Sequence, residues 1–583
     1  MTPHTAFGSI FKPALSVVAL SVAICGEPGG ERLPKPNIVL INLDDLDFDQ
    51  SELWDFYDYR KFPSYSGAEM LGYTNDWKNG LSHKQPMLTP NIRSLAEEGC
   101  VFERFYMTSS LCTPSRYSLM TGQYASRSPA LEKHFGKTEP AGFQLQSDLA
   151  PNQWAVARAL QEAGYATGLV GKWHLAEPGS EERGFLVPAI PDADARDPTV
   201  AARIKKVYQQ GCDYIKRNYG FDYAGAVYQH NANGLGLPQE LVQSEHHMEW
   251  QTFHAKQFID EYHDRPFFLY YAPTAPHGWY GGGEMGDPLD MPIEATVAGY
   301  TDEHIGSQPS REDVRRRIRE NNIDPRNAMA TWLDDSIGEV LKKLKEYGLE
   351  ENTLVIFTSD HQSRGKFSVT EGCHVPFVAR WPGVIPAGSR SRQLMANIDL
   401  AATLLELAGG KIPEDIVTDG LDMSPVFRGK TDWHVARDLL LEVGYARAVV
   451  TDDSWKYTAI RLPEGKMPER DPASWREARA LIKSKGEIPP AEDAPLSQEE
   501  LDCMSYDGRI YYDRFTGAPI LNQGPHRTFP HYADRDQLVD LTADPYEQEN
   551  LHDNPEHAPK LKEMQRRLGE QLAKLPRHFG EFR

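Results

Sequence analysis

Residues 36–45 read PNIVLINLDD, and this stretch decides the fold class. The run 37–42 is apolar between two asparagines, a pattern typical of a strand that is buried on both faces of a sheet. Two acidic residues, Asp44 and Asp45, follow after Leu43. Strands buried on both faces occur mainly in parallel sheets covered by helices, so this stretch predicts an α/β protein.

Outward from this stretch, predicted helices alternate with short apolar strands. Further strands are expected at 101–105, 166–170, 267–272 and 354–358. Helices are expected from Thr89-Pro90 to Gly99, from Thr113-Pro114 onward, at 153–163, at 249–262 and from Asp324-Pro325 to Gly348. The last of these carries an apolar stripe at Met329, Trp332, Leu333, Ile337, Val340, Leu341, Leu344 and Tyr347. The pattern predicts a large, mostly parallel sheet with helices on both faces.

Polar residues follow four of these predicted strands. They are Asp44 and Asp45, Lys172 and His174, His277, and Asp360 and His361. Ligands of such sheets bind beyond the carboxyl ends of the strands. We therefore expect one site, built from distant parts of the chain.

The pattern changes after about residue 430. Short strands are expected at 440–443, 446–450, 455–460 and 536–541, followed by a helix at 559–575. This predicts a catalytic domain at 31–430 and a smaller C-terminal α+β subdomain at 431–583, built on an antiparallel sheet. A long insertion at about 462–535 is rich in Pro, Asp, Glu and Gly.

The N-terminus resembles an export signal. Lys12 precedes an apolar run at 14–24, which is too short to span a bilayer but suits a signal peptide within residues 1–30. No later stretch reaches transmembrane length. We therefore expect a periplasmic or secreted protein without a membrane span, and Cys25 leaves lipidation open.

Charge and cysteine content exclude several functions. The net charge of -22 opposes binding to nucleic acid or anionic lipid, so an anionic substrate needs a local cationic pocket. Six cysteines in 583 residues, without a CxxC pair, do not make a disulfide scaffold or a zinc site.

Residues 111–122 read LCTPSRYSLMTG, and this segment resembles the signature of the type I sulfatases in the alkaline-phosphatase superfamily. Other blocks are similar to sulfatase blocks and stand in the family's order: PNIVLINLDD at 36–45, GLVGKWHL at 168–175, APTAPHG at 272–278, TSDH at 358–361 and VPFVARWPG at 375–383. The likeness covers nearly all of residues 36–555. It implies an alkaline-phosphatase-like fold and a sulfuric ester hydrolase.

The resemblance implies that a maturation enzyme oxidises Cys112 to formylglycine, whose hydrate attacks the sulfur. It also implies one divalent cation, held by Asp44, Asp45, Asp360, His361 and the Cys112 position. Three carboxylates favour a hard ion, most simply Ca²⁺. Many sulfatases carry Asn where this chain has His361, so the imidazole either ligates the cation or lies just outside its shell.

The resemblance further assigns catalytic roles to Arg116, Lys172, His174, His277 and Lys366. Arg116 would orient the nucleophile, and Lys172 and His174 would flank the sulfate, with His174 as the base. His277 and Lys366 would contact the sulfate and the leaving oxygen, with His277 as general acid.

The chain departs from the family pattern near the predicted site. His374 stands where Arg is frequent, and Gln362 where Gly is usual, so leaving-group contacts are expected to differ in this branch. Cys373 is interpreted as a packed thiol.

The expected substrate is a sulfated carbohydrate, because exported enzymes with large loops suit it better than a small aryl ester. Two aromatic stretches are candidate substrate contacts. For 46–87 a small core under a long loop is the slightly favoured interpretation. The stretch 506–532, with His526, Arg527 and His531, equally suits a solvated surface run. The alternatives are a phosphomonoester, phosphodiester or phosphonate hydrolase of the same superfamily, a non-catalytic binder of sulfated glycan with unmodified Cys112, and a thiol hydrolase using Cys112 and His174.

Overall fold

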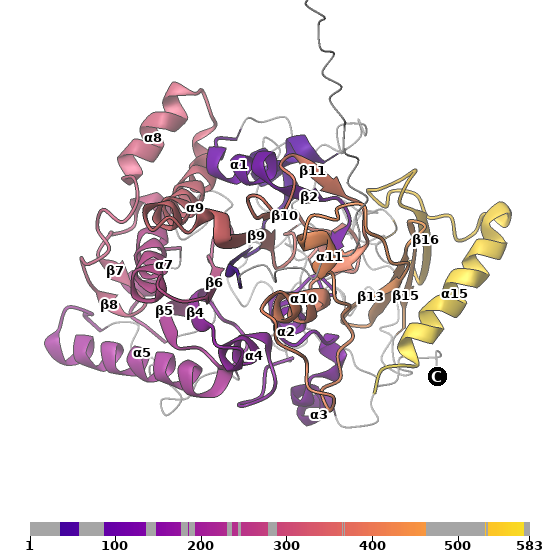
Figure 1. The fold of residues 1–583 in the computed structure, drawn as a ribbon, viewed down its shortest axis with the longest axis horizontal. Helices are drawn as coiled ribbons and strands as arrows, with labels where there is room; N and C mark the ends of the chain where they lie inside the picture. Colours follow the sequence, from indigo (N-terminus) through magenta and orange to yellow (C-terminus); the bar gives the residue numbers. More distant parts are fainter. Residues whose placement is uncertain are drawn as a thin grey trace, which may run out of the picture. The chain divides into compact units, whose positions relative to one another are not determined.

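The computed structural model describes residues 35–57, 87–135, 147–176, 185, 193–229, 236–242, 246–277, 288–363, 365–366, 368–461, 531 and 534–576. Its main element is an eight-stranded sheet in the order β11-β2-β10-β9-β1-β6-β4-β5 (Figure 1). β10 runs antiparallel to its neighbours β2 and β9, and the other pairs are parallel. This confirms the predicted mixed, mostly parallel sheet.

The strands of this sheet are β1 (Asn37–Leu43), β2 (Cys100–Phe102), β4 (Ala166–Lys172), β5 (Tyr223–Tyr228), β6 (Phe267–Ala272), β9 (Thr353–Ser359), β10 (Phe377–Arg380) and β11 (Ser389–Ser391). Two-residue strands lie outside it: β3 (Phe105–Tyr106) pairs with β12 (Met395–Ala396), and β7 (Ala295–Thr296) with β8 (Gly299–Tyr300).

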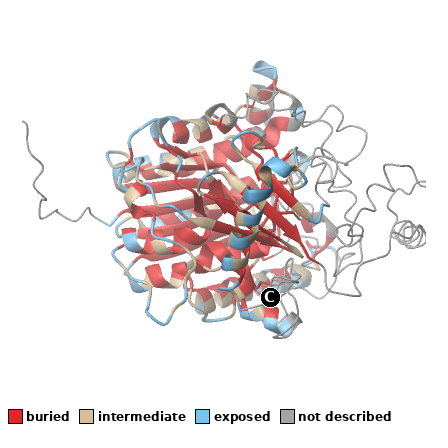
Figure 2. Ribbon diagram, turned by 90° about the vertical axis from the view of Figure 1, so that its right-hand side faces the viewer, coloured by how far each residue is buried: buried red, intermediate tan, exposed pale blue. Residues whose placement is uncertain are grey.

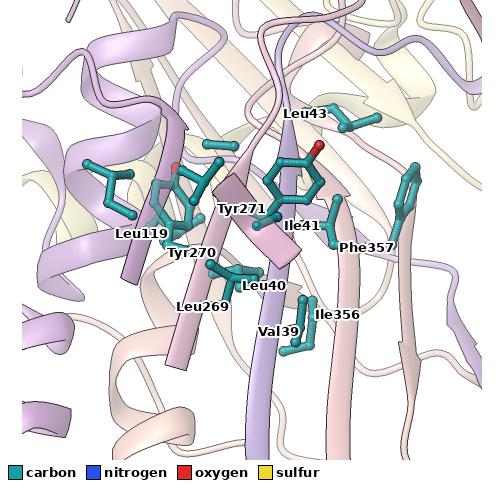
Figure 3. Packing of buried hydrophobic residues seen from close by; sticks show 14 of the residues in the cluster. Val39, Leu40, Ile41, Leu43, Leu119, Leu269, Tyr270, Tyr271, Ile356 and Phe357 are labelled. Atoms are coloured by element: carbon teal, nitrogen blue, oxygen red, sulfur yellow. The ribbon is translucent and has the colours of Figure 1, made fainter. Parts of the chain in front are cut away.

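β1 lies inside the sheet, between β9 and β6, and every one of its residues is buried. Val39 pairs with Leu269 of β6 and Val355 of β9, so the opening stretch of the sequence forms the core strand as predicted. Figure 3 shows the side chains of these three strands packed side by side. Burial of each aliphatic side chain contributes roughly 1.5–3 kcal/mol.

Helices cover the sheet, and Figure 2 shows the buried strands between helical layers. α9 (Ala328–Glu346) packs against both α1 (Pro90–Glu98) and α7 (Met248–Tyr262), and α1 and α7 pack on the sheet. A second group consists of α2 (Cys112–Thr121), α4 (Val156–Glu162) and α10 (Ile398–Leu407). Within the described residues, the remaining α-helices are α3 (Pro129–Phe135), α5 (Pro198–Tyr219), α6 (Gln239–Val242), α8 (Arg311–Glu320), α11 (Ser424–Phe427) and α15 (Ala558–Leu572).

Two predictions about these elements were wrong. The expected strand 101–105 is divided between β2 and β3, because a turn carries Arg104 to the backbone carbonyls of Thr451 and Asp452. Tyr347 is not a core residue of α9, since the helix ends at Glu346. The Tyr347 side chain is 37% exposed, and its hydroxyl donates to Asp260.

The C-terminal part contains the predicted antiparallel sheet. Its strands are β13 (Asp438–Val443), β14 (Ala446–Thr451), β15 (Trp455–Ile460) and β16 (Asp536–Asp540), and α15 packs on them through Met564, Leu568 and Leu572. The domain boundary near residue 430 stays a prediction.

Several predicted features lie outside the described residues. These are the signal peptide with Cys25, most of the aromatic stretch 46–87, and the insertion with His526 and Arg527. The described start of that stretch belongs to the core, because Leu46, Phe48, Leu53 and Tyr57 are buried in it. Among the described residues, no helix combines the length and apolar composition needed to cross a membrane.

Candidate active site

The predicted site residues meet at the carboxyl edge of the sheet. β4, β6, β1 and β9 are parallel neighbours, so their carboxyl ends lie side by side. The strand ends and nearby segments bring together Asp44, Asp45, Cys112, Arg116, Lys172, His277, Asp360, His361 and Lys366.

Cys112 lies at the centre of this group. Its Sγ is 3.3 Å from His361 Nε2, 3.6 Å from Asp44 Oδ1 and 3.6 Å from Lys172 Nζ. It is the first residue of α2, so the positive end of the helix dipole lies at the thiol. The side chain is only 4% exposed, and its neighbours are charged rather than apolar.

Arg116 connects three of the strands. It is one helical turn after Cys112 and fully buried. Its Nε donates to Asp360 Oδ2 (2.9 Å), and its Nη1 donates to the carbonyl of Lys172 (2.9 Å) and to the Tyr270 hydroxyl (3.1 Å). Burial opposes its charge, but these neighbours outweigh burial and raise the pKa of Arg116.

Two lysines neutralise the adjacent aspartates. Lys172 Nζ is 2.5 Å from Asp44 Oδ2, and Lys366 Nζ is 2.7 Å from Asp45 Oδ2. Burial alone would raise both aspartate pKa values, but the cations lower the pKa of Asp44 well below its usual range and that of Asp45 to about 2. Asp45 has a φ of 66°, a conformation that a non-glycine residue adopts only at a cost.

His361 faces the site with both ring nitrogens. Nε2 points to Cys112, and Nδ1 lies 3.1 Å from Asp45 Oδ1. Burial opposes its charge, but Asp360 and Asp45 outweigh burial and raise the pKa of His361 to about 9. Burial raises the pKa of Asp360 itself.

His277 is the most solvent-accessible of these side chains, with 19% exposed. Its Nε2 lies 3.7 Å from Asp45 Oδ2. Burial lowers the pKa of His277 to about 3, so the ring is neutral at neutral pH in the unliganded protein. His174 follows β4 with a φ of 54° and is partly exposed, and its role as a base stays a prediction.

The donor atoms of Asp44, Cys112, Asp360 and His361 all lie within 4.8 Å of one another. This spacing fits a cation with ligands at 2.0–2.6 Å. Asp45 belongs to a second, overlapping group with Asp44 and His277. The carboxylates suit a hard ion, whereas the thiol sulfur is a soft donor and the imidazole nitrogen an intermediate one. The set therefore fits the implied cation best if an oxygen replaces the sulfur.

Sequence reasoning missed two contributors to the site. Tyr270 accepts hydrogen bonds from Asn42 Nδ2 (2.9 Å) and from Arg116, and Ser115 Oγ donates to the Asp360 carbonyl (2.5 Å). Nothing in the sequence distinguishes Tyr270 from the apolar residues around it in β6. Ser115 lies within the sulfatase-like segment 111–122, and this position could have identified it as a site residue.

The departures from the family pattern face the core. The His374 ring stacks on Tyr106, its Nε2 contacts the Glu103 carbonyl (3.0 Å), and burial lowers its pKa to about 4. His374 therefore does not supply the cation that Arg would. Gln362 Nε2 donates to the His374 carbonyl (2.6 Å). Cys373 is fully buried, and burial raises its pKa to about 12, as expected for a packed thiol.

The sequence model of the sulfatase family matches residues 36–410, and this chain belongs to that family. It is 29% identical over 353 residues to an arylsulfatase of Hemicentrotus pulcherrimus, spanning 58% of this chain and 56% of the relative. It is 27% identical over 432 residues to the N-acetylgalactosamine-6-sulfatase of Mus musculus, spanning 70% and 69%.

Among solved structures, the fold is similar to that of a protein from a study of glycosaminoglycan metabolism by Bacteroides thetaiotaomicron. The TM-score is 0.53 at 21% identity, covering 93% of this chain and 99% of the other. This likeness supports the alkaline-phosphatase-like fold.

Proposed function

We propose that this chain is a sulfuric ester hydrolase that removes sulfate from a sulfated carbohydrate. Its nucleophile is formylglycine formed from Cys112 by a maturation enzyme, and its metal is one Ca²⁺ ion. Asp44, Asp360 and His361 hold the cation together with the modified Cys112 position, and Asp45 completes the acidic set. Membership of the sulfatase family and the sugar in the name of the mouse relative support this substrate class.

The position of Cys112 carries the proposal. A thiol 3.6 Å from one carboxylate and within 4.8 Å of a second is poorly matched to a hard cation. Conversion to formylglycine removes the sulfur and supplies oxygen atoms, which match both the cation and a role as nucleophile.

Charge balance explains why a sulfate ester would bind here. The three aspartates are offset by Arg116, Lys172 and Lys366, so a divalent cation leaves the site positive. A bound cation would offset the sulfate charge and lower the pKa of the attacking hydroxyl. Because His361 must lose its proton to act as a ligand, cation binding releases a proton.

The protein's own groups divide the remaining work. Lys172 and Lys366 hold the sulfate oxygens, and Arg116 orients Cys112 and Asp360. His277 protonates the leaving oxygen: its pKa is low in the unliganded site, and the negative charge of the bound ester favours the protonated ring. His174 takes the proton when the aldehyde re-forms. We further propose that residues 1–30 direct export to the periplasm or the medium.

Mass spectrometry of the Cys112 peptide tests this function, using protein co-expressed with a formylglycine-generating enzyme. We expect an aldehyde in place of the thiol, and faster hydrolysis of a sulfate ester than of the matched phosphate ester. An intact thiol despite active maturation machinery would contradict the mechanism. Glycan binding without turnover would then favour a binding protein, and loss of activity on thiol alkylation would favour a thiol hydrolase.

A further inference from the structure

His277 is carried by a turn that follows β6. The turn is closed by a hydrogen bond from the His277 N–H to the Thr274 carbonyl (3.2 Å). The position of Thr274 therefore constrains the backbone that carries the His277 imidazole.

Gln251 of α7 binds Thr274 at two points. Its Nε2 donates to Thr274 Oγ1 (3.0 Å), and its Oε1 accepts from the Thr274 N–H (3.3 Å). The Gln251 side chain is fully buried, and that of Thr274 is 2% exposed. A two-point contact between buried amide and hydroxyl groups fixes orientation as well as distance, and its loss would leave buried polar groups unsatisfied.

The same glutamine also lies against β4. A Cβ added to Gly171, the residue before Lys172, would stand 3.3 Å from Gln251 Oε1 and 2.1 Å from the Ala272 carbonyl. Gln251 thus lies beside the end of β4, which carries Lys172, as well as against the turn after β6 that carries His277.

We propose that Gln251, with Thr274 as its partner, is a positioning residue that holds His277 where it protonates the leaving oxygen. This inference rests on the proposed function and extends it to α7. General acid catalysis matters most when the leaving group is a poor one, because an alkoxide leaves slowly without a proton whereas a nitrophenolate does not need one. Misplacing the acid should therefore affect sugar sulfates far more than activated aryl sulfates.

The experiment compares Gln251→Met with Gln308→Met in fully matured enzyme. Gln308 is a matched control, because it is another buried glutamine, 6% exposed, whose Oε1 accepts from a threonine of α7, Thr252 (2.6 Å). We expect Gln251→Met to lower kcat on a sugar sulfate about 10- to 100-fold with a smaller change in KM, and to lower kcat on nitrophenyl sulfate less than about 3-fold. Gln308→Met should not change the ratio of the two rates.

Two further measurements complete the test. Adding Gln251→Met to His277→Ala should cost little more activity, because both changes remove one function. A crystal structure of Gln251→Met should show His277 displaced. Equal losses on both esters, full additivity with His277→Ala, or an unmoved His277 would each overturn the inference. If matured wild-type enzyme hydrolyses neither ester, the proposed function fails, and the crystal structure still decides whether Gln251 positions His277.

Discussion

Buried charge occurs in two contrasting regions of this molecule, the candidate active site and the cluster around Glu249 on α7. At Glu249, Arg311 donates Nε to Oε1 (2.8 Å) and Nη2 to Oε2 (3.1 Å), and Trp332 Nε1 donates to Oε1 (3.0 Å). Burial opposes the charge of this carboxylate, but Arg311 outweighs burial and lowers the pKa of Glu249. One carboxylate is thus matched by one cation.

The candidate site instead crowds three carboxylates, a thiol and four cationic side chains, of which His361 is one. The carboxyl groups of this site differ in how the protein changes their pKa values: the pKa of Asp44 is lowered, whereas that of Asp360 is raised. Both regions pair carboxylates with cations, but in the candidate site the charge of Asp44 also opposes ionisation of Asp45 and Asp360. Such crowding of like charges costs stability and favours the binding of a cation. The comparison predicts that substitutions affect stability in one region and activity in the other.

The largest expected effect is on turnover. Cys112→Ala should lower kcat more than about 1,000-fold because it removes the nucleophile, with little change in unfolding free energy. Cys373→Ala, at a buried thiol outside the site, should retain activity and lose stability instead. Steady-state kinetics and urea unfolding of both variants check this. Comparable activity losses in the two variants would break the comparison.

The second effect concerns the Glu249 cluster. Arg311→Met leaves a buried carboxylate without its cation and should lower the unfolding free energy by about 3–5 kcal/mol. The double variant Glu249→Gln/Arg311→Met should recover part of that loss, because no charge remains unpaired. Urea unfolding of both proteins measures the difference. No recovery in the double variant would show that packing, not charge, dominates there.

The third effect is stabilisation by calcium. At a free concentration 100 times its Kd, calcium should raise the unfolding free energy by about 2.7 kcal/mol, and EGTA should reverse this. Asp44→Asn should abolish the response, since Asp44 belongs to both groups of donor atoms. Glu249→Gln should retain it. A calcium response that persists in Asp44→Asn would place the cation elsewhere.

The smallest effect is a dependence of stability on pH. Burial lowers the pKa of His247 to about 4, from about 6.5 in the unfolded chain. Its contribution to stability is therefore present above pH 6.5 and is lost as the pH falls toward 4, by about 1 kcal/mol at pH 5.5. His247→Gln keeps a donor for the Ile293 carbonyl but does not titrate. Unfolding at pH 7.5 and 5.5 should show a smaller difference in this variant, and an unchanged difference would contradict the assignment.

The local sequence pattern was sufficient to predict an element where its residues act through their immediate neighbours. The apolar run of β1 was recognisable because, between Asn37 and Asn42, the strand lacks the alternation of polar and apolar residues that a half-buried strand shows. α1 begins at Pro90 with Thr89 as its N-cap, as predicted, but the Thr89 side chain makes no hydrogen bond to the first turn of the helix. Thr89 Oγ1 accepts from Glu52 N–H, and Asp334 accepts from the N–H groups of Asn91 and Ile92 instead.

The sequence alone determined the fold class and most of the residues gathered at the site. Apolar periodicity and the order of the motifs are properties of the chain itself and do not depend on how it folds. Three features are visible only in the tertiary structure. They are the strand order, the hydrogen bond between Arg116 and Tyr270, and the hydrogen bonds of Gln251 to the turn that carries His277. Tyr270 and Arg116 are separated by 154 residues. Buried polar side chains find such partners only when the sheet has assembled, and no local pattern in the chain records the pairing.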